Sequence, residues 1–322
     1  MTTVLPVTLA DVEAAARRIA PFVHRTPVLS SHRLDEILGC EVVFKCENLQ
    51  RIGAFKARGA HNAVFALGEA EAARGVVTHS SGNHAAALSL AARNRGVAAF
   101  IVMPSNAPKA KIESVRRLGG EISFCEPTTT AREAAAAAVV ADRGATLVHP
   151  YDDVRVIAGQ GTATLELLGE VPDLDAILAP VGGGGLMSGT AVAARGLSPS
   201  VRLWATEPEQ ADDAWRSWRS GVRTAGDPPD TIADGLRTTL GENGFVILRA
   251  LLDDFITVRE DSIVAAMRLV WEVLKVVIEP SSAVPVAALL EGKLEVHGRK
   301  VGVILTGGNV DLDNLPWQAP VG

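Results

Sequence analysis

Cysteine and aromatic residues are scarce in this chain of 322 residues. Phe, Trp and Tyr make up 4% of it, which favours close packing of helices on a sheet over an aromatic-rich binding surface. The three cysteines, Cys40, Cys46 and Cys125, lack the spacing of a metal site. Their odd number fits no disulfide framework and is typical of reduced thiols in a cytosol, so we expect a cytoplasmic protein.

Long apolar runs and an excess of basic residues are also missing. No run of about 18 apolar residues occurs, which argues against a transmembrane helix. The N-terminal stretch MTTVLPVTLADVEAAARR has acidic residues early and no apolar core, so we predict no export signal. A formal net charge of −6 argues against nucleic acid, whose phosphates require a basic face. We therefore expect neither a membrane nor a nucleic acid as a partner.

Alternating strand and helix patterns dominate what is present, in a chain long enough for two domains. Apolar runs predict strands at 75–80, 98–104, 121–126 and 146–150, and then at 175–182, 201–208, 253–258 and 300–308. A helix opened by the weak capping box TLAD (8–11), a strand at 41–47 and a helix over about 261–277 complete the pattern. Continuous apolar runs are typical of strands buried on both faces. The pattern predicts an α/β protein with two doubly wound open-sheet domains.

Small and polar residues follow a predicted strand and precede a predicted helix at four places. These loops are GAFKARG (53–59), HSSGNH (79–84), PVGGGGLMSG (180–189) and LTGGN (305–309). Ligands of open α/β sheets bind at the carboxyl ends of the strands, so we expect the four loops to converge on one site.

Four consecutive glycines occupy positions 182–185 in the third of these loops. Their backbone N–H groups can approach an anion closely, and the helix that follows adds the positive end of its dipole. The loop lacks the Gly-Lys-Ser/Thr ending of a nucleoside triphosphate loop, and its spacing does not match a dinucleotide site. It predicts a phosphate site, with a tight turn that binds nothing as the alternative.

The HSSGNH loop offers hydroxyl, amide and imidazole groups at a predicted helix start. Such groups, together with a helix N-terminus, suit a carboxylate. The alternative is ordinary capping of the helix by Ser80 or Ser81, with His84 on a helix face.

Lys56 follows Phe55 at another predicted helix start. By itself it would be a solvated helix residue. Beside a phosphate site and a carboxylate site it gains another use, because lysine forms Schiff bases and pyridoxal phosphate needs both such a lysine and a phosphate site. The three loops together therefore favour an enzyme that uses pyridoxal phosphate.

The order and spacing of short motifs carry a family resemblance. The motifs are FKARGA (55–60), SSGNH (80–84), VIAGQGT (156–162), PVGGGGL (180–186), IADG (232–235), EPSSA (279–283) and LTGGNVD (305–311). Between residues 24 and 312 the chain resembles the threonine dehydratase and serine racemase group of fold-type II (tryptophan-synthase-β-like) pyridoxal phosphate enzymes. The resemblance implies a homodimer whose chains have the cofactor in a cleft between two domains. The large domain would comprise residues 1–65 and 154–322, and a small mobile domain of residues 66–153 would close over the substrate.

The resemblance also implies a set of cofactor contacts. Lys56 would hold the cofactor as a Schiff base. Asn83 would hydrogen-bond the ring hydroxyl oxygen, Thr306 would meet the pyridine nitrogen, and Phe55 and Glu279 would lie near the ring. The phosphate would be wrapped by the backbone amides of Gly182, Gly183, Gly184, Gly185 and Leu186.

The substrate carboxylate would lie at the second loop. The residues implied are Ser80, Ser81, Gly82, Asn83 and His84, with Arg132 helping when the small domain closes. Ser81 would face the side of the cofactor opposite Lys56 and act as a second catalytic residue that exchanges a proton there. A serine at this place permits racemisation without requiring it.

The implied reaction is that of an ammonia-lyase, or dehydratase. An L-3-hydroxy amino acid of the threonine or serine type would lose its α-proton to Lys56 and its β-hydroxyl as water. The enamine that is released would hydrolyse to a 2-keto acid and ammonia. A hydroxyl at Thr306 makes the ring a weaker electron sink than a carboxylate would, which favours rapid loss of a β-substituent. The chain ends soon after the last glycine-rich strand, which predicts an enzyme without an effector domain or feedback by isoleucine.

Other functions stay open at this point. They are a serine racemase with side dehydratase activity, a dehydratase for phenylserine or 3-hydroxyaspartate, and a non-catalytic ligand-binding regulator on the same fold.

The sequence departs from the family pattern at Ile52, Ala54 and Ala85. Ile52 replaces a threonine that helps to bind ATP in animal racemases, which argues against nucleotide activation. Ala54 and Ala85 change polarity and volume close to the substrate.

The stretch TEPEQADD (206–213) has a family counterpart as well. Glu207, the carbonyl of Ala211 and Asp213 match a divalent-cation site of racemase-like relatives. Oxygen ligands suit Mg²⁺ or Ca²⁺, which would have a structural role. A solvated acidic turn is the alternative.

Overall fold

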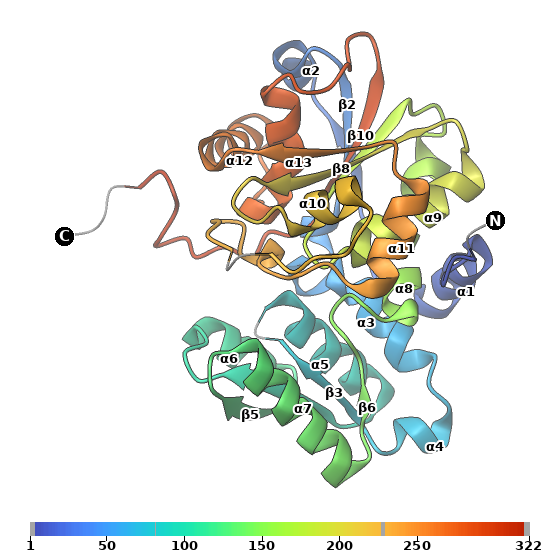
Figure 1. Ribbon diagram of the computed structural model, residues 1–322, viewed down its shortest axis with the longest axis vertical. Coiled ribbons are helices and arrows are strands. Elements are labelled where there is room, and N and C mark those ends of the chain that lie inside the picture. The colour runs from blue at the N-terminus through green and yellow to red at the C-terminus, as the bar shows by residue number, and fades with distance from the viewer. Residues whose placement is uncertain (1–3, 81, 227–228, 319–322) are drawn as a thin grey trace.

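The strands of the protein form two separate sheets (Figure 1). The computed structural model describes residues 4–80, 82–226 and 229–318. The larger sheet has the order β1-β2-β10-β7-β8-β9 and the smaller one the order β5-β4-β3-β6. Among the described strands, β1 pairs antiparallel with β2 and the other pairings are parallel. The predicted α/β class with two open sheets is confirmed.

The bounds of the strands follow the predicted apolar runs. The larger sheet contains β1 (Val28–Ser30), β2 (Glu41–Cys46), β7 (Ala176–Pro180), β8 (Arg202–Pro208), β9 (Asp254–Val258) and β10 (Lys300–Leu305). The smaller sheet contains β3 (Val76–His79), β4 (Ala99–Pro104), β5 (Glu121–Cys125) and β6 (Thr146–Leu147).

Helices cover both faces of the larger sheet. One face is covered by α2 (His32–Leu38), α12 (Glu260–Leu274) and α13 (Pro280–Leu290). The other face is covered by α1 (Leu9–Ile19), α8 (Val154–Glu170), α9 (Gly185–Leu197), α10 (Asp213–Ser220) and α11 (Glu242–Leu251). Strands that lie between two such layers are buried on both sides, which explains their continuous apolar sequences.

The smaller sheet also lies between two layers of helices. Its first face packs against α3 (Lys56–Phe65), α4 (Glu69–Ala72), α5 (Asn83–Arg95) and α6 (Lys109–Arg117), and its second against α7 (Thr129–Arg143). Short 3-10 helices η1 (Glu47–Leu49), η2 (Arg51–Gly53) and η3 (Asp234–Leu236) lie in the connections. Within the described ranges, no helix combines the length and the apolar character that crossing a bilayer requires.

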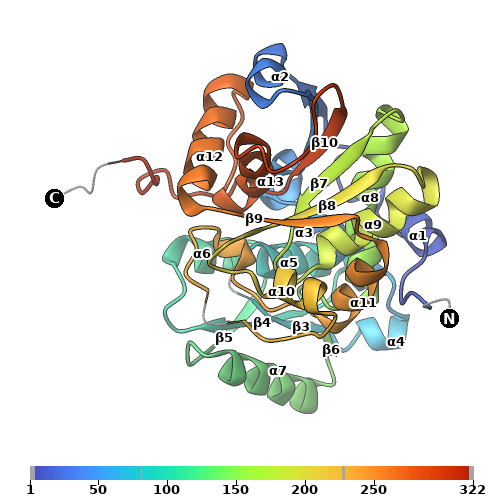
Figure 2. The same cartoon turned by 45° about the horizontal axis from the view of Figure 1, so that its top comes forward.

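Helix α3 lies where the bodies built on the two sheets meet (Figure 2). It crosses α8 at Gly59 and Gly159, where a Cβ added to Gly159 would lie 2.6 Å from the Cα of Gly59. Only glycine allows two helix backbones to approach this closely. The crossing fixes α3, and with it the loop that precedes Lys56, against the larger body.

Local details of the prediction differ from the structure at several elements. The capping box at Thr8 is confirmed, since its hydroxyl accepts from Asp11 N and the Asp11 carboxylate accepts from Thr8 N. The expectation that every strand is buried on both faces is wrong for β5, which lies at the sheet edge with most side chains exposed or half-buried. The helix predicted over 261–277 ends at Leu274, because Lys275 adopts a left-handed conformation with φ of 61°. The strand expected over 146–150 is limited to β6.

Candidate active site

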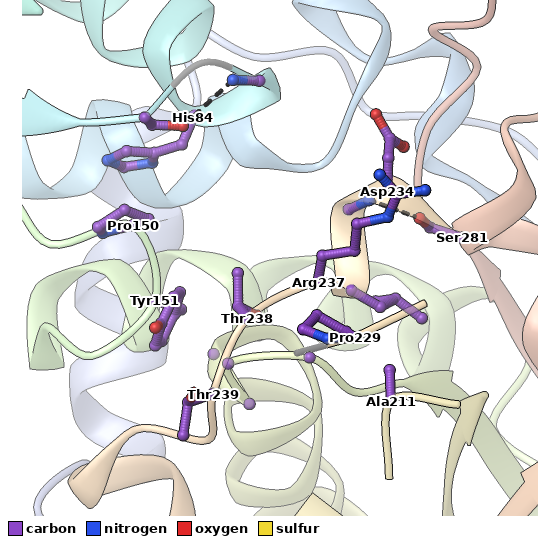
Figure 3. A pocket seen from close by; sticks show the side chains of 18 of the residues that line it. His84, Pro150, Tyr151, Ala211, Pro229, Asp234, Arg237, Thr238, Thr239 and Ser281 are labelled. Atoms are coloured by element: carbon purple, nitrogen blue, oxygen red, sulfur yellow. Dashed lines mark hydrogen bonds between the residues drawn. The ribbon is translucent and has the colours of Figure 1, made fainter. Parts of the chain in front are cut away.

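A cleft of about 1200 Å³ opens between the two bodies at the carboxyl ends of their parallel strands. Residues of all four glycine-rich or polar loops line it, as the sequence predicted. In Figure 3, Pro150 and Tyr151 lie on one side of the cleft, and Asp234, Arg237 and Ser281 lie on the other. The cleft therefore brings together segments that are far apart in the sequence.

Lys56 is the first residue of α3 and lies half-buried in the cleft. The loop before it is held to the loop after β10 by Phe55 N, which donates to Thr306 O at 2.9 Å, and by a bridge between Ala54 and Gly307. The Lys56 Nζ donates to the carbonyl oxygen of Pro150 at 2.8 Å. Burial lowers the pKa of Lys56 to about 8, although the Glu279 carboxylate opposes the shift. The amine is therefore fixed in position and partly uncharged near neutral pH.

Glu279 is 4% exposed and lies at the N-terminus of α13. Asn83 Nδ2 donates to both of its carboxylate oxygens at 3.1 and 3.2 Å, and Asn309 N donates at 3.2 Å. Asn309 Nδ2 donates in turn to Asn83 Oδ1 at 2.9 Å. Burial and the nearby Asp234 raise the pKa of Glu279 to about 7. Sequence reasoning assigned roles to Asn83 and Glu279 but missed Asn309, which orients both.

The glycine loop has no room for side chains. A Cβ at Gly183 would lie 2.1 Å from Tyr151 Cγ, and a Cβ at Gly182 would lie 2.8 Å from Thr238 Oγ1. Gly184 has a φ of 89° and precedes α9, whose first-turn N–H groups have no partner within the helix. The loop therefore presents bare backbone and a helix N-terminus to the cleft, an arrangement that suits an anion.

Two buried hydroxyls lie at the end of β10. Thr306 Oγ1 is 2.9 Å from Ser282 Oγ, which also contacts the backbone oxygen and nitrogen of Gly307 at 2.7 Å. The predicted Thr306 thus belongs to a hydroxyl pair. Ser282 was missed, although it lies in the EPSSA motif that supported the resemblance.

The loop between β3 and α5 lines the same cleft. Ser80 Oγ accepts from Gly82 N at 3.3 Å, and Asn83 begins α5. His84 is 2% exposed, and its Nε2 lies 3.3 Å from the carbonyl oxygen of Val148. Burial holds the pKa of His84 well below its usual value, so the ring is neutral and donates to Val148. The predicted Ser81 lies outside the described residues.

Arg132 projects from α7 into the lining of the cleft, on the opposite side of the small sheet from α5. Its position in the cleft agrees with a contact to substrate. That contact stays a prediction.

Glu207 and Asp213 lie close together beside the cleft. Glu207 Oε2 accepts from Trp215 N at 2.9 Å, whereas its buried Oε1 has no hydrogen-bond partner among the described residues. Burial and the charge of Asp213 raise the pKa of Glu207 well above its usual value, and burial raises the pKa of Asp213 to about 6. No group of three or more His, Cys, Asp or Glu side chains suited to a metal occurs in the described ranges. The third predicted ligand is a backbone carbonyl, that of Ala211.

Comparisons with known proteins agree with the geometry of the cleft. A family model described as "Pyridoxal-phosphate dependent enzyme" matches residues 19–307. The chain belongs to this family. It is 52% identical to the beta-hydroxyaspartate dehydratase of Paracoccus denitrificans (strain Pd 1222), over 97% of this chain and 99% of that protein. It is 48% identical to the serine racemase of Dictyostelium discoideum, over 98% of each chain. The solved structure of maize serine racemase has a TM-score of 0.93 to it, with 46% identity over 95% of each chain.

The residues of the cleft fit the cofactor of the family. The bare glycine loop before α9 suits a phosphate, and Lys56 offers a half-buried amine with a lowered pKa for a Schiff base. The hydroxyl of Thr306 can meet a pyridine nitrogen, and Asn83 and Glu279 lie together in the same cleft.

Proposed function

We propose that the protein is a pyridoxal-phosphate-dependent ammonia-lyase that converts an L-3-hydroxy amino acid into a 2-keto acid and ammonia by α,β-elimination of water. The observation that carries the proposal is the amine of Lys56, which burial and a hydrogen bond to Pro150 prepare for proton transfer. A group with a pKa of about 8 is partly uncharged near neutral pH and can act as a base. The name of the Paracoccus relative, which describes a dehydration, supports the reaction class.

Lys56 has two tasks in this mechanism. Its amine would hold the cofactor, and, once free, it takes the α-proton of the substrate. The cofactor, when bound, supplies an electron sink for the bonds at the α-carbon. The carbonyl oxygen of Pro150 orients the amine, and burial keeps it available as a base. The α-proton and the β-hydroxyl together make up the water that is lost, and a water molecule then hydrolyses the released enamine to the 2-keto acid and ammonia.

The substrate carboxylate is bound at the N-terminus of α5. Ser80 contributes its hydroxyl, Gly82 shapes the turn by donating its N–H to Ser80 Oγ, and Asn83 contributes an N–H group that the helix leaves without a partner. The side chain of His84 donates to Val148, so His84 serves the carboxylate through its backbone and anchors the loop through its ring. Arg132 supplies a positive charge to the substrate carboxylate when residues 66–153 close over the substrate.

The hydroxyl pair of Thr306 and Ser282 favours elimination of the β-substituent over reactions that need a long-lived negative charge at the α-carbon. A hydroxyl beside the pyridine nitrogen does not hold a proton there as a carboxylate would. Negative charge at the α-carbon is then less stabilised, and a β-substituent that can leave does so quickly.

Serine racemisation is the second candidate function. The Dictyostelium and maize relatives are named serine racemases, and the predicted catalytic Ser81 is the residue that would exchange a proton on the side opposite Lys56. A panel of L-3-hydroxy amino acids, including threonine, serine, phenylserine and 3-hydroxyaspartate, separates the two functions. Keto acid and ammonia in equal amounts support the lyase, whereas D-serine formed without matching pyruvate supports the racemase. The name of the Paracoccus relative makes 3-hydroxyaspartate the first substrate to test.

We also propose a structural divalent cation, Mg²⁺ or Ca²⁺, bound by Glu207, the carbonyl of Ala211 and Asp213. The unpartnered Oε1 of Glu207 and the raised pKa values of both carboxyls support it, because burial disfavours their charged forms and a cation would stabilise them. The cation would hold the loop before α10 beside the cleft.

The remaining proposals concern the whole molecule. The chain would act in the cytoplasm as a homodimer, with residues 66–153 moving as a small domain toward residues 1–65 and 154–322. The two sheets have different hydrophobic clusters, which supports such a movement, and the cluster of the small sheet reaches the larger segments through Ala60, Ala63, Val64 and Val156.

A further inference from the structure

His149 is a residue of the cleft to which the mechanism gives no role. It is half-buried in the segment between β6 and α8. Its chain neighbours are Val148, whose carbonyl binds His84, and Pro150, whose carbonyl binds Lys56. His149 therefore lines the cleft, and its chain neighbours contact the helix proposed to bind the substrate carboxylate and the amine proposed to take the α-proton.

The hydrogen bonds of the ring fix its tautomer. Nδ1 accepts from Asp152 N at 2.9 Å and, over a longer 3.5 Å, from Tyr151 N. A backbone N–H can only donate, so Nδ1 carries no proton and the neutral ring has its proton on Nε2. Among the described residues, no hydrogen bond is made by Nε2. The Nε2–H group of His149 therefore points away from the turn formed by residues 149–152 and can donate a hydrogen bond to a ligand.

The ring is also held in place by its neighbours. It meets His79 edge-on, with ring centroids 5.3 Å apart, and Tyr151 edge-on at 4.6 Å. Burial lowers the pKa of His149 to about 4, and the nearby His79 and Lys56 add to the shift, whereas Asp152 and Asp153 oppose it. The imidazole is therefore a rigid neutral donor at neutral pH.

We propose that His149 Nε2–H donates a hydrogen bond to the β-oxygen of the substrate and so assists cleavage of the Cβ–O bond. This inference rests on the proposed elimination of water. When the Cβ–O bond breaks, its electron pair leaves with the oxygen, and the pair of the former Cα–H bond forms the Cα=Cβ double bond. The proton that Lys56 took from the α-carbon passes to the departing hydroxide and completes the water. The histidine keeps its own proton, because a neutral imidazole is a very weak acid. Its hydrogen bond strengthens as negative charge develops on the leaving oxygen, which lowers the barrier.

Two substitutions test the two nitrogens of the His149 ring separately. His149→Asn keeps an oxygen near the Nδ1 position for Asp152 N but removes the donor at the Nε2 position. His149→Gln can place an N–H near the Nε2 position but does not preserve the acceptor for the turn. Each holoenzyme is assayed with the 3-hydroxy amino acid that the wild type uses best and with β-chloro-L-alanine. Chloride leaves without help from a hydrogen bond, so the second substrate reports on every other step.

The expected result is a selective loss. In His149→Asn, kcat/KM for the hydroxy substrate falls by about 30- to 100-fold, whereas kcat/KM for β-chloro-L-alanine changes by less than about threefold. His149→Gln recovers at least part of the loss on the hydroxy substrate. Equal losses on both substrates, or no loss on either, overturn the inference while the proposed function stands. A wild-type enzyme that eliminates chloride but no water from any 3-hydroxy amino acid contradicts the proposed function and overturns the inference with it.

Discussion

The carbonyl oxygen of Pro150 lies 2.8 Å from the Nζ of Lys56, although 94 residues separate the two in the sequence. The same segment places the Tyr151 ring over Gly183 and lets the Asp152 carboxylate accept from the first N–H groups of α11. One short crossover between the two bodies therefore positions the amine, the glycine loop and a neighbouring helix. The amine of Lys56 and the glycine loop proposed to bind phosphate are therefore both positioned by residues 150–152.

Replacing Lys56 is expected to remove activity. Lys56→Ala deletes both the attachment point and the base, so kcat should fall by at least about 10⁴-fold for every substrate that the wild type converts. Lys109→Ala is the control, because Lys109 is an exposed residue in the first turn of α6. Full turnover by Lys56→Ala, measured as keto acid and ammonia, would remove this lysine from the mechanism.

Glu279 is expected to contribute less to the stability of the folded apoprotein as pH rises. Its pKa is raised from 4.5 to about 7 in the folded state, so between these values the folded state binds more protons than the unfolded state. The contribution of Glu279 to the free energy of unfolding therefore decreases across this window, by an amount on the order of 3 kcal/mol. Because the pKa values of Glu207, Asp213 and the buried histidines are shifted as well, urea denaturation at pH 5 and pH 7.5 is compared between wild type and Glu279→Gln, and the free energy of unfolding of the wild type should fall by that amount relative to the variant. Parallel pH profiles of wild type and variant would show that Glu279 titrates normally.

Glycine 183 is expected to tolerate no side chain. Gly183→Ala would place a methyl group 2.1 Å from Tyr151 Cγ, so the ring or the loop must move. We expect a loss of about 1–3 kcal/mol in stability and a weaker affinity for pyridoxal phosphate, measured by equilibrium titration of the apoprotein. Gly169→Ala in α8 is the matched control, since a Cβ there meets nothing within 4 Å. That variant should gain about 0.5–1 kcal/mol in stability.

A carboxylate at position 306 is expected to change the outcome of the reaction. Thr306→Asp would keep a proton on the pyridine nitrogen and stabilise negative charge at the substrate α-carbon. Keto acid formation should slow by about 10- to 100-fold relative to exchange of the α-proton with D₂O. The reason is that the stabilised negative charge at the α-carbon lasts longer before the β-substituent leaves. Thr306→Ser keeps the hydroxyl and should behave like the wild type. An unchanged ratio of exchange to elimination in Thr306→Asp would contradict the role given to this hydroxyl.

A divalent cation is expected to stabilise the protein through Glu207. Mg²⁺ or Ca²⁺ at millimolar concentration should raise the melting temperature of the wild type by a few degrees, since it binds only the folded state. Glu207→Gln should abolish the shift, whereas Glu272→Gln, which alters an exposed ion pair on α12, should preserve it. Equal shifts in the wild type and in Glu207→Gln would place any bound cation elsewhere.

The sequence predicted those parts of the site that local patterns encode. The glycine loop, Lys56 and the loop before α5 each follow a strand end, and parallel sheets bring such ends to one edge. Their convergence on one cleft therefore followed from periodicity and loop composition. The strand runs of the larger sheet were predictable for the same reason, because burial on both faces leaves a continuous apolar sequence.

Residues that act through distant partners were not predictable in this way. Asn309 binds the carbonyl of Ile52, 257 residues earlier, and Ser282 meets Thr306 only because α13 packs against β10. The N–H of Asp152 donates to His149 Nδ1 and so fixes the ring proton on Nε2. No sequence pattern predicted the turn that places these two groups together. Helix α13 itself was missed, since Pro280 and Pro285 in its sequence weaken a helical prediction although Pro280 occupies the first helical position.

The most direct test of the account is to locate the bond between the protein and its cofactor. The protein is reconstituted with pyridoxal phosphate, reduced with borohydride, digested and analysed by mass spectrometry. The account predicts one modified residue, Lys56, with the modification absent when Lys56 is replaced by alanine. A protein that takes up no cofactor, or one modified at another lysine while Lys56 stays free, would contradict it.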